Sequence, residues 1–105
     1  MEPLRELRVR MQLEVRLWGM DSTGKPFSQP ARTIEISGNG ARLEGVACLK
    51  AGEVIGVQHA DQKARFRVAW IGDTGTPEEG QIGIVSLEPG KCIWWQALTE
   101  TTARV

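Results

Sequence analysis

The stretch Ala64-Arg65-Phe66-Arg67-Val68-Ala69-Trp70 is the longest alternation of apolar and polar side chains in the sequence. Its larger apolar residues share one face, and two arginines occupy the other. Successive side chains of a β-strand point to opposite faces, so this period of two predicts a strand with one face in a core and one in water. We therefore expect Phe66 and Trp70 to be core residues.

Segments with the same period lie on both sides of this strand. They cover residues 11–17, 33–37, 41–44, 54–59 and 81–87. The connections are polar or glycine-rich, notably residues 19–29 and 73–80. Asn39-Gly40 suits the tip of a tight hairpin, because both central positions of that turn must tolerate a positive φ. Six short strands joined by such turns predict an all-β fold, either a closed antiparallel barrel or a small sandwich.

The pattern changes after Pro89-Gly90, where residues 92–98 predict one or two helical turns with a frayed end. Trp94 and Trp95 are adjacent, so one helix face cannot bury both; we expect one to cap the barrel and the other to meet a partner. The residues expected to be largely buried are Met11, Leu13, Val15, Ile34, Ile36, Phe66, Val68, Ile82 and Ile84.

Length and charge limit the possible functions. A chain of 105 residues has the size of one domain. Its 13 basic and 13 acidic residues cancel, so nothing favours nonspecific DNA, RNA or membrane binding, and a phosphate site needs a local cluster of arginines. No apolar run approaches the ~20 residues that span a bilayer, and no signal-peptide core is seen. We expect a cytoplasmic protein that does not insert into membranes.

Few residues are available for catalysis or metal binding. Cys48 and Cys92 are too few and too distant for a disulfide scaffold or a zinc site, and we expect both to be buried, reduced thiols. His59 is the single histidine, and no nucleophile–base arrangement or phosphate-binding glycine loop occurs. The sequence therefore predicts a protein that is not an enzyme, with no catalytic residues, cofactor or metal.

The segment Glu35-Ile36-Ser37-Gly38-Asn39-Gly40, with the strands around it, resembles the PilZ domain. That family carries Arg-x-x-x-Arg before its first strand and Asp/Asn-x-Ser-x-x-Gly a strand and a loop later. Ser37 and Gly40 match the second motif, and Glu35 replaces its Asp or Asn. The resemblance covers roughly residues 4–88. It implies an N-terminal arginine-bearing flexible arm over 1–9, a six-stranded antiparallel β-barrel over 10–88, and a short helix with a tail over 89–105.

The first motif is degenerate. Aligning the first strand with the family places Arg8 at the second arginine and Leu4 at the first. No two N-terminal arginines are four residues apart, but Arg5 lies next to the missing position and its long side chain can replace the absent group.

PilZ domains are bacterial receptors of cyclic di-GMP. In the family the arginines contact phosphate and guanine, the Asp/Asn and Ser bond to guanine, and the glycine lets the backbone approach the ligand. The resemblance therefore implies a non-catalytic signalling module that binds cyclic di-GMP and relays the signal to an unidentified protein. The expected ligand-binding residues are Arg5, Arg8, Glu35, Ser37 and Gly40. One missing charged contact costs about 1.5–3 kcal/mol, which implies modest affinity.

Other interpretations remain open. In the second interpretation, after the receptor, the chain is a degenerate PilZ-like adaptor that binds proteins and no nucleotide. Residues 37–40 are then only a hairpin turn, the N-terminal arginines a solvated arm, and Arg42, Arg65 and Arg67 the wet faces of strands. A third class is a small barrel that binds single-stranded nucleic acid. The neutral charge and the lack of aromatics interleaved with basic residues argue against it.

Overall fold

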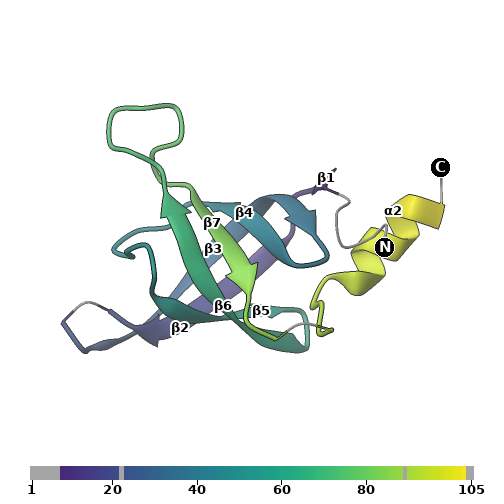
Figure 1. Ribbon diagram of the computed structural model, residues 1–105, viewed down its shortest axis with the longest axis horizontal. Helices are drawn as coiled ribbons and strands as arrows, with labels where there is room; N and C mark the ends of the chain where they lie inside the picture. Colours follow the sequence, from purple (N-terminus) through teal and green to yellow (C-terminus); the bar gives the residue numbers. More distant parts are fainter. Residues whose placement is uncertain (1–7, 22, 89, 104–105) are drawn as a thin grey trace.

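The alternating segments form a closed antiparallel barrel with one helix beyond its end (Figure 1). The computed structural model describes residues 8–21, 23–88 and 90–103. Within these ranges the elements are β1 Val9–Arg10, β2 Glu14–Met20, β3 Pro26–Ser37, β4 Gly40–Glu44, β5 Val54–His59, β6 Gln62–Ile71, β7 Ile82–Ser86 and α2 Trp95–Ala103. The predicted all-β barrel with a short C-terminal helix is confirmed.

Strand β3 closes the barrel because it is long enough to pair on both sides. The order around the wall is β3-β2-β5-β6-β7-β4, and β4 returns to β3. The first part of β3 pairs with β2 and its last part with β4, and every pairing is antiparallel. The short β1 is an addition to the six predicted strands. It pairs with the same end of β3 through Val9, which we had placed in the arm, and Arg10.

The side chain of Thr33, on β3, holds the segment that links β1 to β2. The side chain is fully buried, and its hydroxyl accepts a hydrogen bond from the Leu13 amide (2.8 Å) and donates one to the Met11 carbonyl (2.6 Å). A β-bulge at Ile34 shifts the register of β3 against β4, so Thr33 and Ile36 both face inward. The bulge leaves Ile34 only half-buried, and Met11 and Leu13 are also half-buried against the core, contrary to our expectation.

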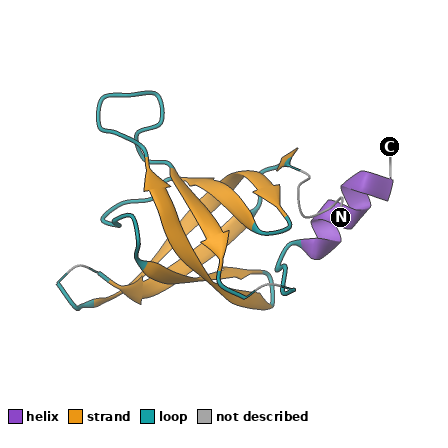
Figure 2. Cartoon of the chain, in the orientation of Figure 1, coloured by secondary structure: helices purple, strands orange, loops and turns teal. Residues whose placement is uncertain are grey.

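The core fills the barrel as the strand patterns predict. The other six residues expected to be buried are so: Val15, Ile36, Phe66, Val68, Ile82 and Ile84. Trp94 caps one end, with its ring centroid 5.5 Å from that of Phe66, whereas Trp95 is 50% exposed. Helix α2 lies outside the strands (Figure 2) and continues to Ala103, into the segment that the sequence predicts to be frayed.

The β2–β3 hairpin is longer than predicted. We expected a polar loop over residues 19–29, but the strands pair as far as Met20 and Pro26. The tip is held by the Asp21 carboxylate, which accepts hydrogen bonds from the Thr23 hydroxyl (2.7 Å), the Thr23 amide (2.8 Å) and the Lys25 amide (3.0 Å). These bonds, the one from the Thr23 hydroxyl most of all, lower the pKa of Asp21.

Neither cysteine is fully buried, although the sequence predicts burial for both. Cys48 is exposed, contrary to our expectation, because it lies at a bend with φ 65° where Val46 and Leu49 take the inward positions. Cys92 is half-buried, and this burial raises the pKa of its thiol, against the opposing effect of a hydrogen bond from the Trp94 backbone. In the described part of the chain, no helix has the length and apolar character needed to cross a membrane.

Candidate functional site

Four of the five expected site residues line a single hollow in the barrel wall, and Arg5 lies outside the described residues. The hollow, here called the Arg8 hollow, measures about 430 Å³. Arg8 immediately precedes β1, Glu35 and Ser37 lie at the end of β3, and Gly40 opens β4. They meet because β1 and β4 both pair with the end of β3.

The turn beside the hollow joins Ser37 to Gly40, within the predicted residues 37–40, but its tip is shifted by one residue. Gly38 and Asn39 form its tip, whereas Gly40, expected at the tip, already pairs with Ser37 in the ladder. The Ser37 hydroxyl lies 3.0 Å from the Asn39 side-chain oxygen. Packing requires a glycine at position 40, because a Cβ there would collide with the backbone carbonyl oxygen of Ile84. The glycine lets β4 pass close to β7.

Two hydrogen bonds tie this turn to the C-terminal part of the chain. The indole Nε1 of Trp94 donates to the Ser37 carbonyl oxygen at 2.7 Å. The Ser86 amide at the end of β7 donates to the Asn39 carbonyl oxygen at 2.8 Å. The turn is therefore held by the barrel cap on one side and by a neighbouring strand on the other.

Arginines gather around Glu35. Register places Arg10 on β1 and Arg42 on β4 opposite Glu35 on β3, and opposite residues project from the same face of a sheet. The carboxylate lies 3.8 Å from Arg8 Nη1 and 4.0 Å from Arg42 Nη2. Three arginines around one carboxylate give this neutral chain the local positive charge that a phosphate site needs. Arg42, interpreted from the sequence as part of a solvated strand face, lines the hollow.

Trp70 also lines the Arg8 hollow, so its predicted place in the core is wrong. A β-bulge at Ala69 separates the pairs Val68–Ile84 and Trp70–Gly83 and turns the indole outward, where it is 40% exposed. The ring covers Gly83, and a Cβ on that glycine would collide with it. The sequence signal for this contact is Gly83, because a glycine within a strand can mark the close approach of another group.

The same arrangement recurs elsewhere on the wall. Trp18 covers Gly56, and Arg65 lies opposite that glycine on the next strand. Arg65 Nε lies 3.8 Å from the Glu88 carboxylate. Trp18, Gly56 and Arg65, here called the Trp18 row, belong to a different hollow of about 480 Å³ that contains none of the expected site residues. This row provides an internal comparison for the Arg8 hollow.

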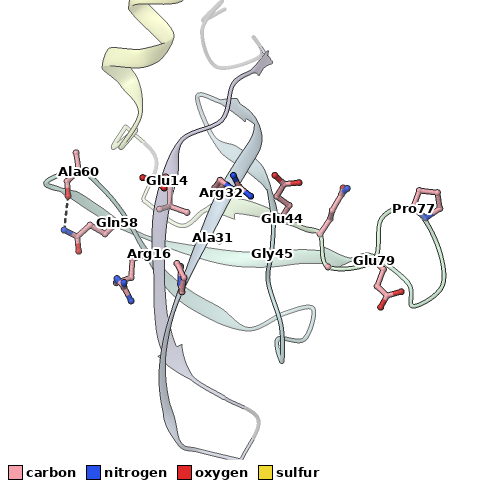
Figure 3. Close-up of a pocket in the computed structure, with 14 residues that line it drawn as sticks. Glu14, Arg16, Ala31, Arg32, Glu44, Gly45, Gln58, Ala60, Pro77 and Glu79 are labelled. Atoms are coloured by element: carbon pink, nitrogen blue, oxygen red, sulfur yellow. Dashed lines mark hydrogen bonds between the residues drawn. The ribbon is translucent and has the colours of Figure 1, made fainter.

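A larger hollow of about 990 Å³ lies beyond the other end of β4 (Figure 3). Its charges alternate along the register, with Arg32 on β3 paired to Glu14 on one side and Glu44 on the other. Arg16 and Glu79 bring the charged lining to two cations and three carboxylates. Acidic groups outnumber basic ones, so this hollow is a poorer place for a phosphate than the Arg8 hollow.

The sequence matches no model of a known protein family. A search of curated proteins finds no match either. Among the residues that the structure describes, no group of three or more His, Cys, Asp or Glu side chains is placed to hold a metal ion. The barrel and the chemistry of the Arg8 hollow are therefore the features that point to a function.

Proposed function

We propose that this chain is a non-catalytic, PilZ-like module of bacterial signalling that binds cyclic di-GMP in the Arg8 hollow. One observation carries the proposal. Arg8, Glu35, Ser37 and Gly40, the described positions at which the PilZ resemblance expects ligand contacts, line the same hollow. A local excess of positive charge accompanies them, which suits a ligand with two phosphates.

Each side chain has a role suited to its environment. The Arg8 side chain is 77% exposed, so it can turn toward a phosphate or the O6/N7 edge of guanine. Ser37 and Glu35 supply hydrogen-bonding groups for guanine, and Arg5 assists Arg8. The exposed Trp70 ring offers a face on which a base can stack. We propose the cytoplasm as the location, consistent with two free cysteines.

A second function, that of a protein-binding adaptor without nucleotide, is favoured by different observations. Glu35 already pairs with Arg8 and Arg42, so the arginines have a partner within the chain. Trp95, half-exposed on α2, provides an apolar contact for a partner protein. In the receptor, the surface around Trp95 would relay the signal to a partner protein. In the adaptor, the same surface would be the main binding site.

Calorimetric titration with cyclic di-GMP tests the receptor. We expect wild type to bind with modest affinity and Arg8→Ala to weaken binding about 10- to 150-fold, the equivalent of the 1.5–3 kcal/mol of a hydrogen bond to a charged group. Arg67→Ala is the matched control, because Arg67 is an exposed arginine that reaches the Gly52 carbonyl and does not line the hollow. Equal affinities for the two variants would rule out the proposed site.

A repaired variant separates receptor from adaptor. Leu4→Arg restores the first arginine of the motif, and Glu35→Asp restores its acidic residue. If wild type gives no heat at hundreds of micromolar ligand but the double variant binds, the barrel has lost its nucleotide site and the adaptor is correct. If the double variant also gives no heat, the alignment of Arg8 and Ser37 with the motifs is wrong.

A further inference from the structure

The carboxylate of Glu35 forms ion pairs with two arginines of the Arg8 hollow. It lies between the guanidinium groups of Arg8 and Arg42, at 3.8 and 4.0 Å. The Glu35 side chain is only 25% exposed, whereas that of Arg8 is 77% exposed. A carboxylate on β3 thus contacts an exposed arginine on one side and a strand arginine on the other.

Arg42 has unused hydrogen-bonding capacity. Its side chain is 34% exposed, and its Nε atom is buried without a hydrogen-bond partner among the described residues. A guanidinium has five N–H donors, and leaving buried donors unsatisfied is unfavourable. Its contact with Glu35 is longer than the roughly 2.7–2.9 Å of a charge-assisted hydrogen bond. Because about a third of the side chain is exposed, the Nη groups can form closer hydrogen bonds with another anion.

We propose that Arg8 and Arg42 together bind a phosphate group and that Glu35 is the internal counter-ion that this phosphate displaces. The inference rests on the proposed function, because the phosphate would belong to the ligand of the same hollow. It assigns to Arg42, on the barrel wall, the contribution lost where Leu4 replaces the first arginine of the motif. It also gives Glu35 a competing role that is separate from any contact with guanine.

The relative strength of the contacts supports displacement. Ion pairs of this length are weak where water still reaches them, and salt screens them; Arg8 is largely exposed, and Arg42 and Glu35 are partly so. A phosphate oxygen can approach a guanidinium closely and bond to two of its N–H groups at once. A phosphate therefore gains more from the arginine pair than Glu35 loses. The competition still lowers the apparent affinity for any anion.

Inorganic pyrophosphate is the probe for this inference, because it carries phosphate charge but no guanine to contact Glu35. Titration of the full chain at low salt, followed by NMR amide shifts, gives its affinity. We expect Glu35→Gln to tighten binding about three- to tenfold, the equivalent of one or two exposed ion pairs. We expect Arg42→Gln to weaken it about tenfold or more, the equivalent of a charge-assisted contact.

The ion pair between Glu88 and Arg65 of the Trp18 row supplies matched controls. Glu88→Gln and Arg65→Gln disrupt an ion pair of similar length, 3.8 Å, outside the Arg8 hollow, and should change pyrophosphate affinity less than twofold. Thermal unfolding verifies that each variant is folded. If Arg42→Gln does not fold, Arg42→Lys replaces it: Lys keeps the charge but lacks the bidentate geometry, and should weaken binding by a smaller factor.

Three results would overturn the inference: pyrophosphate fails to bind wild type and Glu35→Gln at millimolar concentration, Glu35→Gln does not tighten binding, or the folded Arg42 variant binds as wild type does. The proposed function can fail separately. If pyrophosphate behaves as expected but cyclic di-GMP does not bind, the anion site stands and the nucleotide receptor does not. If cyclic di-GMP binding depends on Arg8 but the pyrophosphate results fail, only the Glu35–Arg42 inference is lost.

Discussion

Gly40 serves both the barrel and its candidate site. The PilZ resemblance implies that a glycine here lets the backbone approach the ligand. The structure adds that a side chain at this position would collide with the Ile84 carbonyl oxygen. Because that oxygen belongs to the backbone of a neighbouring strand, relief requires β4 or β7 to move. Weaker ligand binding by a Gly40 variant would therefore not, by itself, prove a ligand contact.

We predict that Gly40→Ala lowers the free energy of unfolding by about 1–3 kcal/mol, the usual cost of overpacking. The control is Gly19→Ala, where the nearest atom to an added Cβ is 3.2 Å away and belongs to the Phe27 side chain, which can adjust. This control should cost less than about 1 kcal/mol. Urea unfolding gives both values; equal stability of the two variants would contradict the packing argument.

Trp70 shows where residue-level prediction from sequence ends. The alternation over 64–68 correctly predicts Phe66 and Val68 as core residues. The extra residue at Ala69 then reverses the face of each later side chain, and nothing in the local alternation reveals a bulge. Arg42 was missed for a related reason: a polar residue on an outward face has the same pattern whether it faces water or a ligand.

At the scale of elements, the hydrogen bonds of Thr33 help to position Arg8. Residues 11–13 link β1 to β2, and the Thr33 side chain bonds to backbone groups at both ends of this link. This connection fixes β1 against the end of β3. Because Arg8 immediately precedes β1, its position at the hollow depends on the same connection.

Thr33→Val should therefore lower the free energy of unfolding by about 2 kcal/mol or more, since it leaves the Leu13 amide and the Met11 carbonyl without their partner. Thr33→Ser keeps the hydroxyl and loses one methyl group, which costs about 1 kcal/mol. Denaturant unfolding measures both, and hydrogen exchange at the Leu13 amide reports the local bond. The account fails if Val is tolerated as well as Ser.

Element boundaries were predictable only where a strand borders the core. The prediction for β5 agrees with the structure at both ends, because one of its faces is buried along most of its length. The β2–β3 hairpin extends past the core, so polar residues occur on both faces and residues 19–29 resemble a loop. Adjacent tryptophans likewise indicated that one would be buried, but only the packing against Phe66 selects Trp94.

At the scale of the whole molecule, barrel closure creates the candidate site. The register of β1, β3, β4, β7 and β6 brings Arg10, Glu35, Arg42, Gly83 and Trp70 into one lateral row. These residues are spread over most of the sequence, and the net charge of the chain is zero. Composition alone therefore could not reveal a basic cluster. The motif order predicted Arg8, Glu35, Ser37 and Gly40, and closure added Arg42 and Trp70.

The tryptophans allow a direct test of where cyclic di-GMP binds. The chain has four, and each indole N–H gives its own NMR signal. Trp70 lines the Arg8 hollow, whereas Trp18 covers a comparable glycine in another hollow. Trp94 donates to Ser37 beside the proposed ligand, and Trp95 lies on the helix. One spectrum thus reports on Trp70 at the site, on Trp94 beside it and on Trp18 as a matched control.

Titration of cyclic di-GMP into ¹⁵N-labelled protein is the measurement that tests the central claim most directly. We predict that the Trp70 indole signal shifts progressively and saturates, that the Trp94 signal shifts less, and that the Trp18 signal stays in place. Arg8→Ala should move the Trp70 titration to higher ligand concentration without changing the spectrum of the unbound protein elsewhere. A shift of Trp18 with Trp70 unmoved, or no indole shift at hundreds of micromolar ligand, would contradict the account.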